Sequence, residues 1–172
     1  MNTEAIEVGV VMQRLTINNR WQSHQWRPFE IVAHDVLPAG GSRCLLDAPD
    51  DTRWVFGNFE IKLFADEAEG YFLNINADYP CWFIMWRIEN IDGADIAVPK
   101  SVTLSYNEAA RLMDGGETVD NLPLPLDLIE RIAAFTSENY HPVKKGKRKK
   151  PSFEGGAGVE KMAQAEGKAH GG

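Results

Sequence analysis

Residues 81–88 read Cys-Trp-Phe-Ile-Met-Trp-Arg-Ile, and this stretch decides the fold. Its large apolar side chains fall on both faces of an extended chain, which is typical of a strand covered on both sides. A turn signal at residues 78–80, which ends in proline, precedes it. The stretch therefore predicts a central strand that places Trp82, Ile84 and Trp86 in the hydrophobic core.

The residues before this strand predict several more strands. In residues 54–64, three apolar residues beginning at Phe59 alternate with charged ones, the pattern of a strand with one face in water. The polar residues 66–70 predict a hairpin loop, and residues 71–75 predict the strand that returns from it. Residues 47–52 predict an earlier turn.

The N-terminal part, residues 7–36, predicts another hairpin. Its first half is rich in β-prone residues and ends in a turn signal, Asn18-Asn19. A polar connection follows, and residues 29–32 predict the second strand. Pro38 and the glycines after it end that strand, because they interrupt strands strongly.

The pattern becomes helical after Pro99. Ser105 followed by Glu108 matches a capping box, in which the two side chains satisfy free backbone amides at a helix start. The glycine pair 115–116 is a natural stop for this helix. A second helix is predicted to begin near Pro125, a residue suited to the first helical turn, and an apolar stripe follows it.

Five to seven strands followed by two helices predict an α+β fold. We expect a mainly antiparallel small β-barrel or sandwich, packed by the two C-terminal helices. Residues 1–143 are expected to form this single β-rich domain. Residues 144–172 combine a basic run and glycines with almost no large apolar side chains, so they are expected to be a disordered tail.

Composition and charge narrow the class of protein. The chain has 172 residues and is 44% hydrophobic, which is enough for a core. The net charge is −7. Residues 1–143 hold 10 Lys and Arg against 22 Asp and Glu, a net charge of −12. Residues 144–172 hold 8 Lys and Arg against 3 Glu, a net charge of +5. An acidic body repels phosphates, which argues against nucleic-acid binding except at the tail.

The sequence also predicts a cytoplasmic protein without a membrane span. The N-terminus shows no signal-peptide pattern, and no apolar stretch approaches the roughly 20 residues that a spanning helix needs. Cys44 and Cys81 are the two cysteines. Two lone thiols suit a reducing compartment, although a single bridge between them is geometrically possible.

No catalytic, metal or cofactor site is predicted. His24, His34 and Cys44 are spaced ten residues apart and form no metal-binding motif, so separate surface histidines and a buried Cys44 thiol are expected. Cys81 lies in an apolar strand, where burial disfavours a thiolate, and is expected in the core. The glycine pairs lack nucleotide-binding spacing. The paired carboxylates fall in predicted loops, where water keeps their pKa ordinary and unsuited to acid–base catalysis.

Arginine and tryptophan are interleaved in the first predicted hairpin. Both are enriched at binding hot spots, because each combines a large contact area with directional donors. The candidate partner- or anion-binding residues are Arg14, Arg20, Trp21, Trp26 and Arg27. The alternative is structural: the tryptophans cover the open end of the sheet, and the arginines stack on them or pair with the acidic body.

The basic run after the last helix is a second candidate contact segment. Such runs bind nucleic acid, anionic lipid or an acidic partner. The alternative is a solubilising tail that stays near its own acidic domain. The candidate residues are Lys144, Lys145, Lys147, Arg148, Lys149 and Lys150.

Several short motifs resemble those of a known family. They are Arg14, Arg20-Trp21, Trp26 and Pro28, then Glu69-Gly70-Tyr71-Phe72-Leu73-Asn74, Pro80, Ser105-Tyr106-x-Glu108-Ala109 and Val119-Asp120-x-Leu122-Pro123-Leu124-Pro125. Together they resemble a bacterial family known as domain of unknown function 3305, which is encoded beside molybdenum-dependent formate dehydrogenases and their maturation factors. The likeness covers nearly all of residues 8–143 and the basic stretch after them. It implies an accessory role in assembly, cofactor insertion or quality control, and no catalytic residue.

The leading hypothesis is therefore a non-catalytic accessory protein that binds a formate dehydrogenase subunit or maturation factor. A second hypothesis is a module that holds a small anion, such as a molybdopterin species, against Arg14, Arg20 and Arg27. Nucleic-acid binding through the tail is a third. An enzyme remains a fourth, which would require a deep pocket holding a titratable pair.

Overall fold

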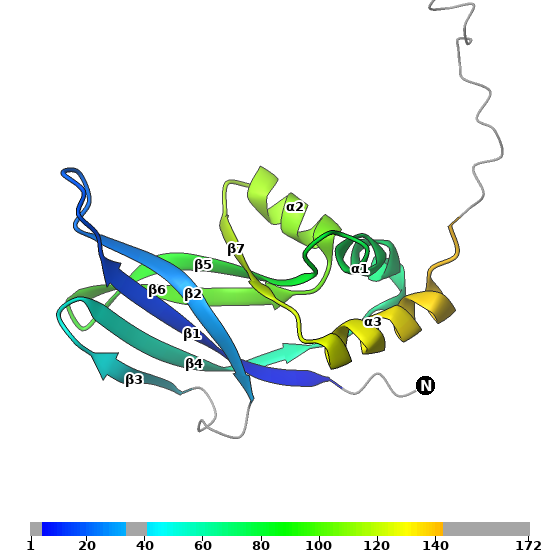
Figure 1. Ribbon diagram of the computed structural model, residues 1–172, viewed down its shortest axis with the longest axis horizontal. Coiled ribbons are helices and arrows are strands. Elements are labelled where there is room, and N and C mark those ends of the chain that lie inside the picture. Colours follow the sequence, from blue (N-terminus) through cyan, green and yellow to red (C-terminus); the bar gives the residue numbers. More distant parts are fainter. Residues whose placement is uncertain (1–4, 34–40, 143–172) are drawn as a thin grey trace, which may run out of the picture. The chain divides into compact units, whose positions relative to one another are not determined.

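A computed structural model describes residues 5–33 and 41–142 of the chain (Figure 1). The described residues as far as Tyr140 form one compact unit, and His141 and Pro142 belong to a second. The tail predicted for residues 144–172, with its basic candidates, lies outside the described residues. None of the described helices is long and apolar enough to cross a bilayer.

Four antiparallel strands form the first sheet, in the order β2-β1-β4-β3. Their bounds are β1 Ile6–Thr16, β2 His24–Ala33, β3 Ser42–Asp47 and β4 Asp51–Ile61. The long β1–β2 pair confirms the predicted N-terminal hairpin, although β2 begins within the stretch predicted as a connection. Strand β3 was not predicted, because its six residues are all exposed and show no alternation.

Three antiparallel strands form the second sheet, in the order β6-β5-β7. They are β5 Cys81–Ile91, β6 Ala94–Thr103 and β7 Thr118–Pro123. The β5–β6 hairpin turns through Asp92 and Gly93, whose φ angles of 51° and 88° match the left-handed turn that such hairpins favour. Strand β5 is central, as residues 81–88 predict.

The helices gather at one end of this unit (Figure 1). A 3-10 turn, Ala65–Glu67, leads into α1, Ala68–Ile75, and the other two helices are α2, Tyr106–Asp114, and α3, Leu126–Asn139. Helix α1 packs against both α2 and α3. Helix α3 begins after Pro125, and α2 ends at Asp114, immediately before the predicted stop at Gly115.

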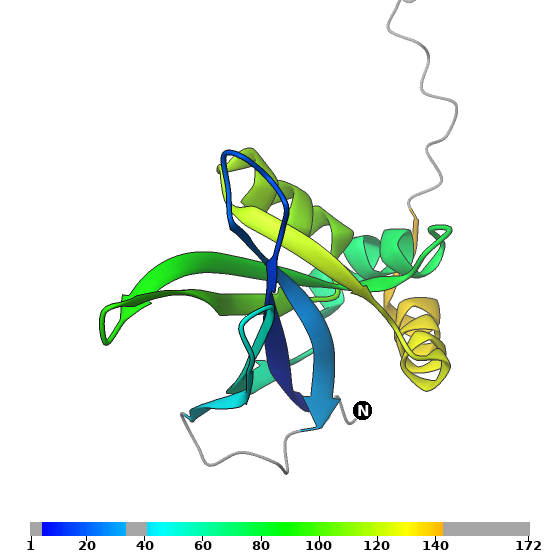
Figure 2. The ribbon, with the colours of Figure 1, turned by 60° about the vertical axis from the view of Figure 1, so that its left-hand side comes forward.

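The two sheets pack face to face around one core. The first sheet contributes Val10, Met12 and Phe56, and the second contributes Trp82 and Ile84. Side chains of α3 complete the core from the end of the sandwich. Figure 2 shows the two sheets as separate layers that do not close on each other. The predicted sandwich is therefore confirmed, and the predicted barrel is wrong, because the outer strands of the two sheets share no ladder.

Helix α1 replaces the loop and strand that were predicted over residues 66–75. Its buried positions include Ala68, Tyr71 and Asn74, which lie three residues apart on one helical face. A short apolar run does not distinguish a strand from one face of a helix, so the residues alone favoured the wrong element. The prediction of two helices, both after the strands, is wrong in number and order: α1 precedes β5, and α2 precedes β7.

Candidate protein-contact surface

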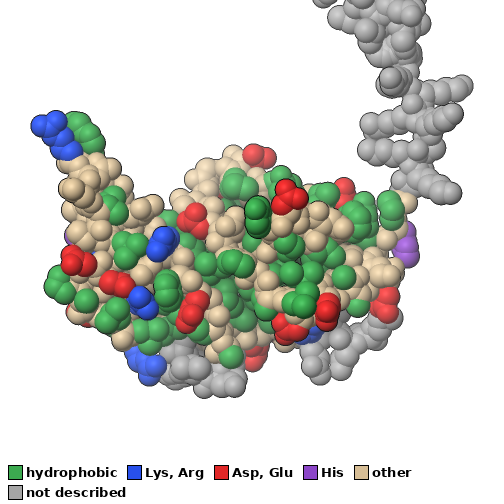
Figure 3. Space-filling model, in the orientation of Figure 1, with side chains coloured by type: hydrophobic (Ala, Val, Ile, Leu, Met, Phe, Trp, Pro, Cys, Tyr) green, Lys and Arg blue, Asp and Glu red, His purple; other side chains and the backbone are tan. Residues whose placement is uncertain are grey.

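The hairpin tip, residues 17–23 between β1 and β2, projects from the body of the unit (Figures 1 and 3). At the tip, 88% of Trp21 is exposed, and Arg20 beside it is exposed as well. In the space-filling view, basic and hydrophobic side chains cover the end of this projection. The tip thus presents an indole and a guanidinium together to the surroundings.

The backbone of the hairpin tip is restrained by hydrogen bonds. The N–H of Trp21 donates to Asn19 Oδ1 at 2.9 Å, a turn in which an Asn side chain replaces a backbone acceptor. The N–H of Ile17 donates to the carbonyl of Ser23 at 3.0 Å and closes the loop. At its base, Thr16 donates from its N–H to the carbonyl of Asp50 at 3.1 Å. The exposed pair is therefore held on an ordered turn.

Arg20 has no hydrogen bond and no ion pair with the residues that the structure describes. Trp21 likewise stacks on no other ring in the described part of the chain. The side chains of Trp21 and Arg20 therefore make no stabilising contact of these kinds within the described residues, and both are available to a partner.

Arg14 and Trp26 lie lower on the same hairpin and face each other across β1 and β2. The guanidinium of Arg14 lies over the Trp26 ring at 5.9 Å from its centre, and Arg14 Nη2 donates to Thr52 Oγ1 at 3.3 Å. The Trp26 ring packs against the core. This pair therefore stabilises the hairpin, as the structural alternative expects.

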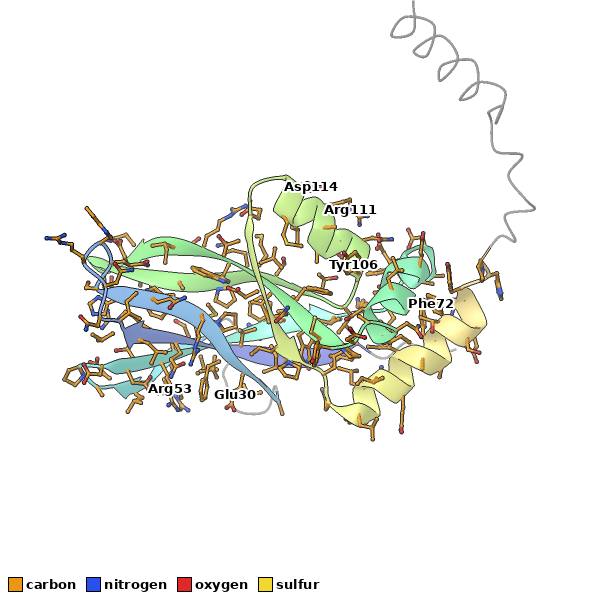
Figure 4. All side chains as sticks on the ribbon, turned by 45° about the horizontal axis from the view of Figure 1, so that its top comes forward. Glu30, Arg53, Phe72, Tyr106, Arg111 and Asp114 are labelled. Atoms are coloured by element: carbon orange, nitrogen blue, oxygen red, sulfur yellow. The ribbon has the colours of Figure 1, made fainter. Side chains whose placement is uncertain are left out.

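Arg27 points to the opposite face of the sheet from Trp26, because successive strand residues alternate in direction. Its Nε donates to Gln13 Oε1 at 3.1 Å, and Gln13 Nε2 donates to Asp51 Oδ1 at 3.1 Å. Arg53 completes this polar row: it binds both carboxylate oxygens of Asp51, at 3.2 and 2.8 Å, and lies over the Phe29 ring at 4.2 Å. Figure 4 shows Arg53 on the first sheet.

The five candidate residues therefore occupy three places. Arg14 and Arg27 point to opposite faces of the sheet, and Arg20 lies at the tip. Three guanidinium groups so arranged do not converge on one small anion. The geometry gives no support to the anion-binding hypothesis at these residues, whereas Arg20 and Trp21 remain together as a contact pair.

A partly buried polar cluster joins the 3-10 turn before α1 to the start of α2. The Ser105 hydroxyl accepts from the Glu108 N–H at 3.2 Å, which confirms the predicted helix cap, and donates to Glu67 Oε2 at 2.7 Å. Glu67 Oε1 accepts from Arg111 at 2.8 Å. The hydrogen bond from Ser105, and then that from Arg111, hold the pKa of Glu67 below its ordinary value. Lowering the pKa of a carboxylate weakens it as a base, and the contacts of Ser105 are those of a helix cap.

The second half of the capping box is altered. The Ser105 N–H donates to Thr103 Oγ1 at 3.1 Å, and the Thr103 hydroxyl donates to Glu108 Oε2 at 2.9 Å. The threonine thus stands between the two groups that a standard capping box joins directly.

Asn74 and Tyr71 on α1 fasten neighbouring segments. Asn74, 1% exposed, donates to the carbonyls of Cys81 and Leu104 at 2.8 and 2.9 Å and accepts from the Cys81 N–H at 3.1 Å. The Tyr71 hydroxyl accepts from the Phe64 N–H at 3.0 Å, and burial raises its pKa. Each polar atom is engaged with the backbone, so these side chains stabilise the fold.

The thiols and the histidines that the structure describes do not assemble into a metal site. Cys81 is buried, as predicted, and burial raises its pKa. The expected burial of Cys44 is wrong, because all residues of β3 are exposed. Both thiols are free, so no bridge joins them. Within residues 5–33 and 41–142 no group of three or more His, Cys, Asp or Glu could hold a metal ion. His34 lies outside the described residues.

The fold and this surface define a two-sheet α+β sandwich with a projecting, aromatic-tipped hairpin. The chain belongs to the family described as "Protein of unknown function (DUF3305)", whose model matches residues 7–149. No curated protein and no solved structure matches the chain.

Proposed function

We propose that this chain is a non-catalytic accessory protein that binds a partner protein through the hairpin tip. One observation carries the proposal: Trp21 is 88% exposed on an ordered turn, next to an arginine without a partner in the described residues. Tryptophan and arginine are the residues most enriched among those that dominate binding energy.

The tip suits binding for two physical reasons. Burying an indole removes about 150–250 Å² of surface from water, a large part of the free energy of a small contact. The turn is already ordered by its own hydrogen bonds, so little conformational entropy is lost when a partner docks. The matching surface is an apolar recess for Trp21 with a carboxylate at its rim for Arg20.

We propose a subunit or maturation factor of a molybdenum-dependent formate dehydrogenase as the partner. The support is the resemblance to a family encoded beside those genes, and gene neighbourhood is an association and not a contact. A cytoplasmic location accords with this proposal.

Co-purification from cells that express the whole gene locus tests the proposal. We expect the tagged protein to retain an oxidoreductase subunit or maturation factor at low salt, and Trp21→Ala to reduce that recovery at least tenfold. Tyr79→Ala is the matched control, because Tyr79 is also an exposed aromatic residue, 86% exposed, in a turn far along the chain. Equal recovery by Trp21→Ala and Tyr79→Ala would exclude the hairpin tip as the contact.

A further inference from the structure

Two strands from different sheets lie side by side without pairing. Strand β2 is an outer strand of the first sheet and β7 an outer strand of the second, within the residues that the structure describes. The two strands approach each other at the side of the sandwich. An outer strand carries backbone N–H and C=O groups that can pair with an added strand.

A groove of about 730 Å³ opens between β2 and the corner where β7 leads into α3. Its lining includes Val8, Trp82 and Leu128, which belong to the hydrophobic core. A second hollow of about 400 Å³ continues along β2, and Phe29 and Leu122 line both. The two hollows together follow residues 27–33 of β2, so the groove is elongated, and core residues form its floor.

The outer edge of β2 is open to pairing over a limited length. Pro28 lacks an N–H, and the register of β1 and β2 shifts between Pro28 and Glu30, which leaves Phe29 as the extra residue of a bulge. Residues 30–33, which follow the bulge, all line the groove. An added strand therefore meets regular backbone there.

Acidic side chains line the two walls of the groove. Glu30 on β2 and Asp127 in the first turn of α3 are both exposed and make no hydrogen bond within the described part of the chain. Glu30 also interacts electrostatically with Arg53. Asp120 and Arg27 both line the second hollow, where Asp120 accepts from the Trp86 indole and Arg27 donates to Gln13. Glu7 and Arg131 also line the groove and already interact within the chain. Among the charged residues that line the two hollows, Glu30 and Asp127 are the ones that make no hydrogen bond or ion pair within the described residues, and both are negative.

We propose that this groove binds an extended peptide segment of a partner protein, which adds as a strand along residues 30–33 of β2. Alternate side chains of the segment are apolar and enter the groove, since every second residue of a strand points to the same side. A lysine or arginine of the segment faces Glu30 and Asp127. This surface is separate from the hairpin tip and goes beyond the function proposed for it.

A peptide-display selection against the full-length protein tests this inference. We expect enriched sequences with apolar residues at alternate positions and one lysine or arginine. The enriched peptide is then synthesised together with a copy whose alternate backbone nitrogens are methylated. Methylation removes the donors that pair with a strand, so we expect the methylated copy to bind at least tenfold more weakly.

Two double variants, which each remove two negative charges, test whether the peptide binds in the groove. In Glu30→Gln/Asp127→Asn we expect the peptide to bind about three- to tenfold more weakly, since two partly exposed charge contacts are lost. Asp114→Asn/Glu138→Gln changes the net charge equally but away from the groove, and should bind as the wild type does. Circular dichroism checks that both variants are folded.

The outcomes separate this inference from the function proposed above. Three results would each contradict peptide binding in the groove. They are equal binding by the two double variants, equal binding of the methylated and unmethylated peptides, and a selection that enriches no peptide. Trp21→Ala should bind the peptide normally. A failed peptide-binding test would therefore not contradict the function proposed for the hairpin tip. A failed co-purification test would likewise not contradict peptide binding in the groove.

Discussion

Gly70 lies where α1 passes closest to the start of α2. A Cβ added there would lie 2.0 Å from Ser105 Oγ and 3.0 Å from Ser105 Cβ. In an exposed helix, replacing glycine by alanine stabilises by up to about 1 kcal/mol. At this position the contact reverses the sign, because the cap residue and its hydrogen bonds must move.

We predict that Gly70→Ala lowers the free energy of unfolding by about 1–3 kcal/mol. Urea denaturation measures this change. Gly115→Ala is the control, since its added Cβ would come no closer than 3.4 Å to any atom, and its effect should stay small. A Gly70→Ala protein as stable as the wild type would show that the two helices are further apart than described.

Ser105→Ala should lower the free energy of unfolding by about 1–2 kcal/mol. The substitution removes the helix cap and leaves Glu67 without the donor that binds its Oε2 at 2.7 Å. Ser105→Thr retains a hydroxyl and tests the role of that group separately from burial. Equal urea midpoints for the wild type and Ser105→Ala would contradict the prediction.

Glu67 makes part of the stability depend on pH. Its folded-state pKa lies below the ordinary value of about 4.3, because Ser105 and Arg111 bind the carboxylate. The stabilisation is therefore complete above that pH, and it is lost as pH falls through the folded-state pKa. We compare the free energy of unfolding of the wild type with that of Glu67→Gln. The wild type should be more stable by a constant amount at pH 6–7, and this difference should shrink toward pH 3. A gap that stays constant down to pH 3 would be the contrary result.

At the scale of elements, the sequence predicts a helix or strand best where the residues of that element carry a recognisable local pattern. The apolar β5, the cap at Ser105 and the start at Pro125 were all predictable, because each depends on neighbouring residues alone. Helix α1 was not, since its burial depends on contacts with α2 and α3. Strand β3 is held by pairing with β4 and carries no burial pattern.

The two tryptophans of β5 differ in a way that the apolar pattern does not reveal. Trp82 is 4% exposed, whereas Trp86 is only half-buried and donates from its indole N–H to Asp120 Oδ2 at 2.7 Å, joining β5 to β7. The prediction that Trp86 lies in the core is therefore too strong: it packs at the margin of the core. Its polar end explains the position, because a buried indole N–H needs a partner.

We expect Trp82→Ala to lower the free energy of unfolding by about 3–5 kcal/mol. Trp86→Ala should lower it by about 1–3 kcal/mol, from partial burial and one hydrogen bond. Trp86→Phe keeps most of the packing and isolates the hydrogen bond. Chemical denaturation of the three variants ranks them, and a larger loss for Trp86→Ala than for Trp82→Ala would reverse the assignment.

At the scale of the whole molecule, the family-like motifs divide into two groups. Gly70, Asn74 and Ser105 meet at the junction of α1 and α2, where their contacts explain them as parts of the fold. Arg20 and Trp21 make no such contacts within the described residues. The sequence could place arginines and tryptophans on one hairpin. The strand bounds, visible only once β1 and β2 are paired, separate the stabilising residues in the strands from Arg20 and Trp21 in the tip.

This division predicts that binding and stability respond to different substitutions. Because Trp21 is 88% exposed and lies outside the core, Trp21→Ala should change the free energy of unfolding by less than about 0.5 kcal/mol. Trp26→Ala removes a ring that packs on the core and supports Arg14, so it should destabilise the protein by more than about 1 kcal/mol. Thermal denaturation and partner recovery, measured on the same two preparations, distinguish the roles. If Trp21→Ala unfolded as readily as Trp26→Ala, the exposed indole would be a structural group, and its loss of partner binding would follow from unfolding alone.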